Sequence, residues 1–252
     1  MAFSITTSIY LFLGGLLGGF IDSIAGGGGL ISIPILLSVG IPPHQAIATN
    51  KFQSSFGSFS ASVNYSLKGF VDFKIAIFGI IYTLFGSIIG SITVQMISTE
   101  FLNYFIPIFL LIIFIYFILS PQAGSEDKKS LVDQRSFFAL AGFILGFYDG
   151  FFGPGTGSFW AMAFVFFLGY NLKKATGYTK VMNFTSNIVS LIVFIIGNQV
   201  FYQAGIIMGT GQIIGAITGS KMVIIKEIKF IRYCLLIIVG LTIINLLRIH
   251  YN

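Results

Sequence analysis

The chain has 252 residues, of which 56% are hydrophobic and 9% are charged, with a formal net charge of +6. A soluble domain is typically about 25% charged, so this chain cannot cover a globule with charge, and its mean hydropathy of +0.94 indicates an integral membrane protein. One cysteine and two histidines exclude a disulfide framework and a Cys- or His-rich metal site.

The first half of the chain predicts a glycine-broken helical hairpin followed by three long helices. An apolar helix over 5–21 leads to a break at 22–29, where four consecutive glycines disfavour a helix. The short apolar piece over 30–40 rises 1.5 Å per residue and covers about half of a bilayer core of roughly 30 Å. The three long helices are predicted over about 44–67, 75–97 and 101–119.

The polar run 120–135 separates this half from a second half with the same parts. The second half begins with a helix over 136–148, a break at 149–157 and a short piece ending at Gly169. Three helices follow, over about 174–197, 202–220 and 230–247. The sequence therefore predicts one all-α, polytopic membrane domain. Its parts are a first repeat (1–119), a cytoplasmic linker (120–135) and a second repeat (136–252).

The two halves are related by an internal repeat. Gly-Phe-Ile-Asp at 19–22 matches Gly-Phe-Tyr-Asp at 146–149, which lies 127 positions later. After the glycine turn the offset becomes 129, and Lys51 then matches Lys180. Small-residue matches are common in a glycine-rich chain, whereas a matched Asp and a matched Lys are rare here and therefore carry the repeat.

Positive charges decide between two paths for the short pieces. Each piece could complete one broken spanning helix, or it could turn back at the glycines as a hairpin. Cytoplasmic loops of membrane proteins are enriched in Lys and Arg. The hairpin path, with the N-terminus outside, gives each half an odd net number of crossings, so the repeats are predicted to be inverted, as in secondary transporters. It also places 11 of the 14 basic residues in inner loops at 68–74, 120–135, 169–174 and 221–232.

Four ionisable residues lie within the repeated motifs, namely Asp22, Lys51, Asp149 and Lys180. Charges at membrane depth are unfavourable and usually mark function or a partner. The alternatives are that each aspartate caps a helix end and that each lysine extends to the headgroups. The repetition at equivalent positions favours a functional role.

Glycine breaks and polar side chains surround these charges. A helix that opens with glycines presents unpaired N–H groups and a positive dipole end to an anion, although close helix packing and interhelical hydrogen bonds are alternatives. Asn183 and Asn187 follow Lys180 on one helical face. We expect a small anion to be bound by Gly26, Gly27, Gly28, Gly29, Thr49, Asn50, Lys51, Gln53, Ser54, Gly153, Gly155, Thr156, Gly157, Lys180, Asn183 and Asn187.

Asp22 and Asp149 precede these turns, where a fixed negative charge would repel an anion. Two arrangements resolve the conflict. Each aspartate pairs with Lys51 or Lys180 in the empty protein, so that the substrate competes for the lysine. Alternatively, an aspartate takes up a proton, since burial favours the neutral acid, and acts in ion coupling or gating. The sequence slightly favours pairing.

These motifs resemble the sulfite exporter TauE/SafE family. The resemblance rests on Phe20-Ile-Asp-Ser-Ile-Ala-Gly-Gly-Gly-Gly-Leu30 with Ala48-Thr-Asn-Lys-Phe-Gln-Ser54, and on Gly146-Phe-Tyr-Asp-Gly-Phe-Phe-Gly-Pro-Gly-Thr-Gly-Ser158 with 180–187. It covers nearly the whole chain and is closest to the compact, widely distributed branch. The resemblance implies a bacterial or archaeal inner-membrane permease for a sulfur oxyanion, a sulfonate or a small organic acid, without indicating which.

The expected function is therefore secondary transport of a small anion by alternating access at a midplane site between the repeats. An anion channel is the alternative, and an intramembrane enzyme is a weaker one because no nucleophile–base pair can be assembled. The expected partners are the anion, the lipid bilayer and, with proton coupling, protons. A homo-oligomer is left open, and no nucleic acid, cofactor or metal is expected.

Overall fold

The computed structural model describes residues 3–119 and 127–225, and in these residues every regular element is an α-helix. The all-α expectation is therefore confirmed. The predicted helix over 230–247 lies outside the described residues. The helices are α1 (Ile5–Ala25), α2 (Gly29–Ser38), α3 (Pro43–Leu67), α4 (Phe73–Gln95), α5 (Thr99–Leu119), α6 (Gln134–Phe151), α7 (Thr156–Leu168), α8 (Leu172–Ile196) and α9 (Tyr202–Ile225).

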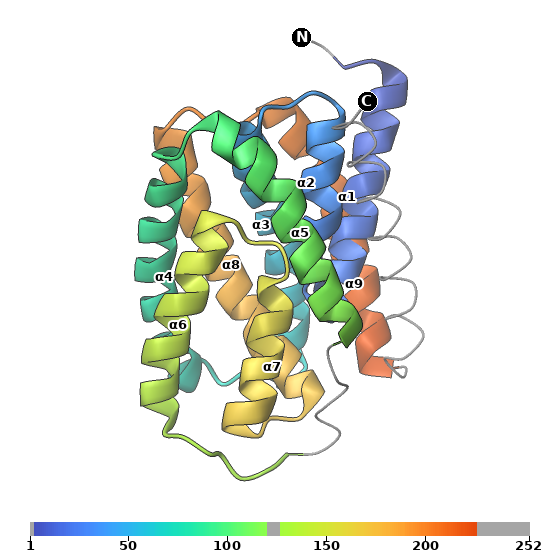
Figure 1. The fold of residues 1–252 in the computed structure, drawn as a ribbon. Helices are drawn as coiled ribbons and strands as arrows, with labels where there is room; N and C mark the ends of the chain where they lie inside the picture. The colour runs from blue at the N-terminus through green and yellow to red at the C-terminus, as the bar shows by residue number, and fades with distance from the viewer. Residues whose placement is uncertain (1–2, 120–126, 226–252) are drawn as a thin grey trace.

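In each half the chain turns back at the glycines and forms a helical hairpin, as predicted, and does not continue as one spanning helix. Helix α1 descends from the end at which the chain begins and α2 returns to that end, whereas α6 and α7 form a hairpin that opens to the opposite end (Figure 1). The chain leaves α1 at Gly26, with φ of 75°, and enters α7 at Gly155, with φ of 83°. These left-handed conformations favour glycine, because a Cβ would strain them.

The breaks begin later than the sequence predicted. Asp22 and Asp149 were expected to open the breaks, but Asp22 lies in the last turn of α1 and Asp149 in the last turn of α6. The intervening residues still adopt helical backbone, and α1 ends where the Gly26 N–H donates to the Asp22 carbonyl. Both carboxylates are therefore carried on helices and not on loops.

Each half of the chain packs its first helix against the other half. The most extensive helix contacts are α1 with α9 and α4 with α6. A Cβ on Gly86 would overlap the carbonyl oxygen of Phe143, and one on Gly215 would overlap that of Leu16. These two contacts are related by the same offsets as the sequence repeat. Small residues at matched positions thus allow the helix backbones to approach closely.

The outward faces of the helices are apolar. Within the described residues, the helical stretches Ile5–Ile24, Phe73–Gln95 and Leu172–Ile196 are long and apolar enough to cross a bilayer. On α4, the exposed side chains recur at helical spacing and are Ile77, Ile81, Phe85, Ile89 and Ile92. Such a surface suits lipid and not water, so the protein is a helical membrane protein.

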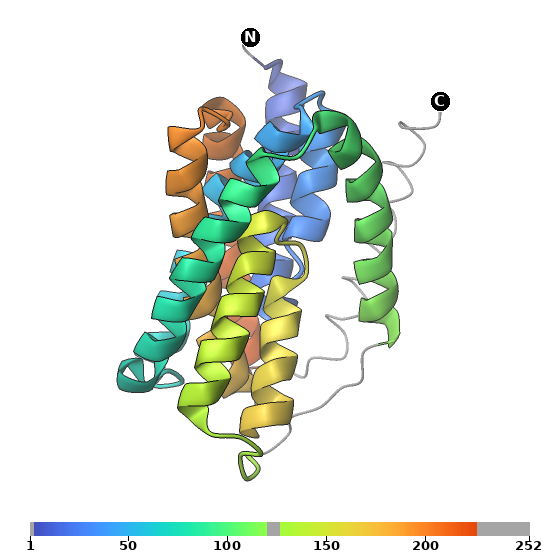
Figure 2. The same cartoon turned by 60° about the vertical axis from the view of Figure 1, so that its left-hand side comes forward.

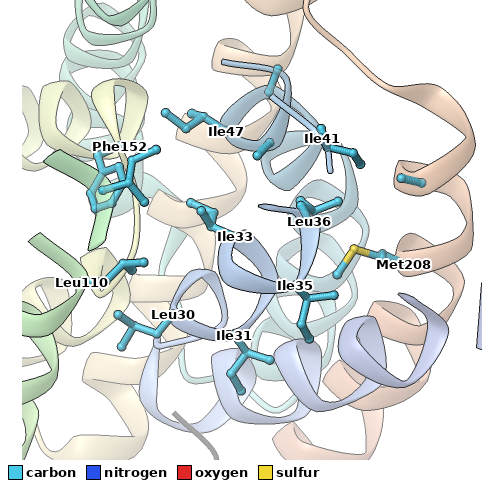
Figure 3. Packing of buried hydrophobic residues seen from close by; sticks show 14 of the residues in the cluster. Leu30, Ile31, Ile33, Ile35, Leu36, Ile41, Ile47, Leu110, Phe152 and Met208 are labelled. Atoms are coloured by element: carbon cyan, nitrogen blue, oxygen red, sulfur yellow. The ribbon is translucent and has the colours of Figure 1, made fainter. Parts of the chain in front are cut away.

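The short helices α2 and α7 lie in two different cores. Around α2 the buried side chains are mostly aliphatic, with Leu30, Ile33 and Leu36 packed near Leu110 and Phe152 (Figure 3). Around α7 they are aromatic and include Phe138, Trp160, Phe164 and Tyr178. Both short helices are therefore held between long helices, which fixes where their N-terminal ends point.

The described parts of the predicted inner loops gather at one end of the bundle, the lower end in Figures 1 and 2. The linker is tied to the α7–α8 turn, because the Lys128 N–H donates to the Gly169 carbonyl at 2.7 Å and the Asn171 N–H donates to Asp127 Oδ1 at 2.6 Å. The basic loops thus share one side, as the hairpin path requires. That this side is cytoplasmic stays a prediction.

Candidate functional site

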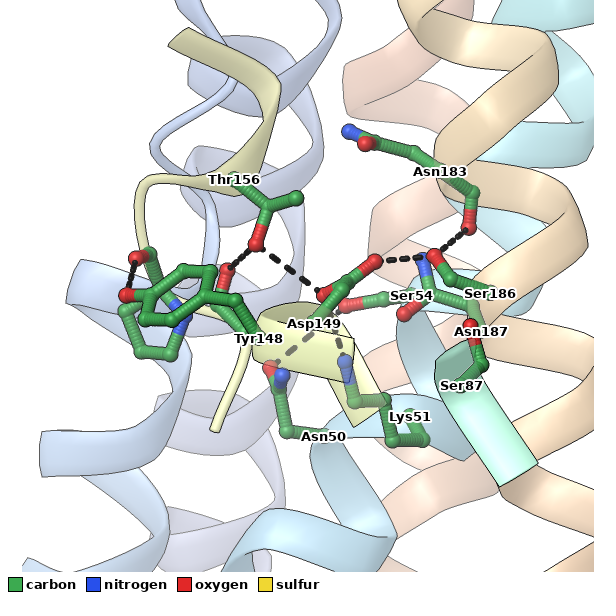
Figure 4. Close-up of polar contacts among 12 residues, drawn as sticks. Asn50, Lys51, Ser54, Ser87, Tyr148, Asp149, Thr156, Asn183, Ser186 and Asn187 are labelled. Carbon is green, nitrogen blue, oxygen red and sulfur yellow. Dashed lines mark hydrogen bonds and ion pairs between the residues drawn. The ribbon is translucent and has the colours of Figure 1, made fainter. Parts of the chain in front are cut away.

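A buried ion pair joins the two halves at the middle of the bundle. Lys51 on α3 donates from Nζ to Oδ1 of Asp149 on α6 at 2.6 Å (Figure 4). The two side chains are 1% and 5% exposed. In so dry a setting neither charge is stable without the other, so the pair holds only while α3 and α6 stay together.

Two hydroxyl groups also hold the Asp149 carboxylate. The single hydroxyl proton of Thr156, the first residue of α7, is shared between the Gly153 carbonyl at 2.6 Å and Asp149 Oδ1 at 3.2 Å, and the Ser186 hydroxyl of α8 donates to Oδ2. The turn beside them is fixed as well, since the Tyr148 hydroxyl donates to the Pro154 carbonyl at 2.5 Å. The Asp149 carboxylate is therefore neutralised by Lys51 and oriented by Lys51, Thr156 and Ser186, which lie on three different helices.

The equivalent pair in the other half has fewer contacts. Lys180 on α8 lies 3.1 Å from Oδ2 of Asp22 and also donates to the Asp22 backbone carbonyl. The Lys180 side chain is fully buried, whereas the Asp22 side chain is 19% exposed. At the repeat offsets, Thr156 corresponds to Gly29 and Ser186 corresponds to Gly57. Neither hydroxyl therefore has a counterpart beside Asp22.

Both pairs are formed between the repeats, with a lysine from one half and an aspartate from the other. Of the two arrangements that the sequence left open, the structure has the paired one. The positions of the charges are thus established, while their roles in binding and coupling remain predictions.

The two glycine breaks meet in the structure. A Cβ on Gly26 would overlap the backbone of Gly157, and one on Gly29 would lie 3.1 Å from Pro154 Cα. A Cβ on Gly157 would also lie 2.9 Å from Nδ2 of Asn183. The breaks therefore form one junction at which backbone touches backbone, and glycine is what makes this approach sterically feasible.

Several N–H groups at these breaks already have partners. The Leu30 N–H donates to the Gly27 carbonyl at 3.0 Å, and the Thr156 N–H donates to the Gly153 carbonyl at 3.1 Å. Such tight turns satisfy donors that a bare helix end would offer to an anion. The N–H groups of Leu30 and Thr156 are therefore already used inside the turns, and the anion contacts expected of the neighbouring glycines stay a prediction.

The other predicted polar residues fall into two groups. Asn50, Gln53 and Ser54 contact one another on α3, with Gln53 Nε2 donating to Asn50 Oδ1 at 2.8 Å. By contrast, Thr49 accepts the Phe201 N–H at 3.0 Å, which ties α3 to the start of α9. Asn187 lies 3.4 Å from Ser58 and links α8 to α3.

Three polar residues at the centre escaped the sequence-based prediction, namely Tyr148, Ser186 and Gln212. Ser186 lies inside the polar stretch Thr185-Ser186-Asn187, but Asn183 and Asn187 matched the helical spacing from Lys180 and were chosen instead. Gln212 is a buried amide in the middle of α9, whereas the neighbouring Thr210 is exposed. An amide side chain within a membrane helix was the signal that could have identified it.

Buried ion pairs at the contact of two broken helical hairpins are features of helical membrane transport proteins. The comparison with known proteins agrees, because the model of the family described as sulfite exporter TauE/SafE matches residues 11–246. The chain belongs to the sulfite exporter TauE/SafE family.

Relatives cover most of the chain. A probable membrane transporter protein of Haemophilus influenzae is 44% identical over 88% of this chain and 87% of its own length. The probable membrane transporter protein YfcA of Escherichia coli strain K12 is 43% identical over 90% of this chain and 85% of its own length. The sulfite exporter TauE/SafE family protein 6 of Arabidopsis thaliana is 35% identical over 39% of this chain and 22% of its own length. No solved structure matches the chain. These names indicate membrane transport and not catalysis.

Proposed function

We propose that this protein is a secondary transporter for a small anion in the cytoplasmic membrane of a bacterium or archaeon. The observation that carries the proposal is the pair of buried lysines, each neutralised by an aspartate of the opposite repeat where the glycine breaks meet. A buried cation whose partner is a carboxylate is chemically prepared to bind another oxyanion in that partner's place.

The ion pairs also supply a gating mechanism. Because each pair joins the two repeats, an anion that takes one lysine from its aspartate removes one of the two links between the halves, while the other pair keeps the halves joined. The halves then move relative to one another and expose the junction to the other side, which is alternating access between inverted repeats. Sulfur oxyanions, sulfonates and small organic acids carry the oxygen acceptors that this chemistry needs, and the family description names sulfite.

Proton coupling follows from the same exchange. An aspartate that has lost its lysine is left as a largely buried carboxylate without a countercharge. Uptake of a proton by Asp22 or Asp149 would then accompany the anion. The variants Asp22→Asn and Asp149→Asn test this step, since the variant that lacks the proton-accepting carboxylate should retain anion binding and lose accumulation driven by a pH gradient.

The deciding experiment is a flux assay with the purified full chain in proteoliposomes, using sulfite, sulfate, thiosulfate, sulfoacetate and small carboxylates. We expect saturable uptake of at least one anion. Loss of a charged hydrogen bond costs about 1.5–3 kcal/mol, so removing a lysine that contacts the anion should raise half-saturation roughly 10- to 150-fold.

The matched variant is the double substitution Lys51→Met with Lys180→Met. An unchanged half-saturation in this variant would overturn the proposal and leave the lysines as structural groups. An ohmic current with no saturation would instead identify a channel.

A further inference from the structure

We propose that the anion binds on the Asp22–Lys180 side of the junction, where Gln212 of α9 is its second donor, and that the Asp149–Lys51 pair is a permanent structural link. This inference rests on the proposed function and deepens it. The sequence motifs treat the two sides as equivalent, so the argument depends on what surrounds each carboxylate.

The first step concerns how firmly each carboxylate is held. Asp149 receives hydrogen bonds from Lys51, Thr156 and Ser186. Within the described part of the chain, the Asp22 carboxylate has a hydrogen bond from Lys180 alone. Asp22 is also the more exposed of the two. Displacing Asp22 from its lysine therefore breaks fewer interactions than displacing Asp149.

The second step concerns an unused donor. Gln212 is 1% exposed, and among the residues that the structure describes its Nε2 has no hydrogen-bond partner. A buried amide without a partner is unfavourable and calls for an explanation, such as a ligand. A Cβ on Gly18 would lie 3.2 Å from this nitrogen. Gly18 precedes Asp22 by one turn on the same face of α1, so the amide lies close to the Asp22 side.

The third step compares the side chains that stand at matched positions in the two repeats. Gly57 leaves the space that Gln212 occupies, because a Cβ on Gly57 would overlap Gln212 Oε1. At the equivalent positions stand Ser186, which donates to Asp149, and Thr83, whose hydroxyl lies 3.6 Å from the sulfur of Met182. The Asp149 side thus uses Ser186 on its own carboxylate and Thr83 on a methionine sulfur, whereas the Asp22 side keeps an amide donor without a partner among the described residues.

The donors define the class of ligand. An ammonium group and an amide N–H match an anion with at least two oxygen acceptors, such as sulfite, a sulfonate or a carboxylate, better than a spherical halide. A single lysine neutralises a single negative charge. We therefore expect a singly charged oxyanion to take the position of the Asp22 carboxylate.

The test uses the purified full chain in detergent and measures the half-saturation of anion-dependent thermal stabilisation. The probes are acetate and sulfite at a pH where sulfite is singly charged, with the dianions thiosulfate and sulfoacetate and the spherical chloride as comparisons. Gln212→Leu should raise half-saturation about tenfold or more, as for a lost hydrogen bond to a charged group. Thr83→Val, at the matched position of the other repeat, should leave it unchanged. Equal effects of the two substitutions, or no effect of Gln212→Leu, would overturn the inference.

A second variant guards against simple misfolding. Gly57→Ser combined with Gln212→Thr gives the Asp22 side the residues that stand at the matched positions of the other repeat, Ser186 and Thr83. We expect this protein to melt at or above the temperature of the parent and to lose anion-dependent stabilisation. A folded double variant that binds like the parent contradicts the inference. A parent that no probe stabilises and that transports none of them refutes the proposed function itself, so the two failures are distinguishable.

Discussion

The Asp149–Lys51 and Asp22–Lys180 pairs come from one repeated motif but have different surroundings. Three donors hold Asp149 in a dry setting, whereas Lys180 alone holds the carboxylate of the more exposed Asp22 within the described residues. The difference arises at Thr156 and Ser186, whose counterparts are glycines. A repeat thus fixes where charges meet, and a few neighbouring hydroxyls decide whether a pair is permanent or exchangeable.

The largest expected effect is on stability when Lys51 is removed. Lys51→Met leaves the Asp149 carboxylate buried without a countercharge, and breaking a buried pair in this way costs about 3–5 kcal/mol. Lys180→Met should cost less, because Asp22 is partly exposed and can be hydrated. Chemical unfolding of the purified variants in detergent measures both values.

Lys68→Met is the control for this comparison, since Lys68 is an exposed residue at the end of α3 and should change stability little. If Lys180→Met lowers the free energy of unfolding as much as Lys51→Met or more, the distinction between a permanent and an exchangeable pair would fail.

A second prediction concerns the junction that both pairs share. Gly26→Ala places a Cβ against the backbone of Gly157, whereas Gly40→Ala meets nothing within 4 Å. Both glycines have a left-handed backbone, so both variants carry the same penalty of roughly 1–2 kcal/mol. Overpacking should destabilise Gly26→Ala by a further 1–3 kcal/mol or so.

Thermal unfolding of the two alanine variants side by side isolates that contact, because Gly40→Ala carries the backbone strain alone. Equal melting temperatures would mean that the two hairpins do not touch at Gly26 in the folded protein.

The sequence predicted the hairpins well because four glycines and short apolar pieces left two paths, and the distribution of Lys and Arg decided between them. It placed the breaks three or four residues too early, since nothing local prevents Ala25 or Phe151 from continuing a helix. The rare Asp and Lys residues were identified because charges are conspicuous in an apolar chain. Which aspartate meets which lysine depends on how the repeats pack, and no single-sequence pattern encodes that packing.

Ser186 and Gln212 show where sequence reasoning stops for a second reason. Each acts through a residue on another helix, Asp149 for Ser186 and the neighbourhood of Asp22 for Gln212. Helical periodicity reports which residues share a face, but not which face opposes it. The comparison of repeats could have drawn attention to both, because Ser186 and Gln212 are positions where the halves differ in polarity or size.

The smallest predicted effect is also the most direct test of the permanent pair. Ser186→Ala removes one donor from the Asp149 carboxylate and should destabilise the protein by about 1 kcal/mol, while Lys51 and Thr156 keep the charge paired. Anion half-saturation should stay at the parent value, because this side does not exchange its carboxylate. Thermal unfolding and the anion-dependent shift report the two quantities in one experiment.

Ser190, one turn further along α8, provides the matched control. Its buried hydroxyl has no hydrogen-bond partner among the described residues, so Ser190→Ala should be neutral or slightly stabilising. If Ser186→Ala instead shifts anion half-saturation and leaves stability unchanged, the hydroxyl serves ligand binding. The Asp149 side would then be the one that opens, and the assignment of permanent and exchangeable pairs would be reversed.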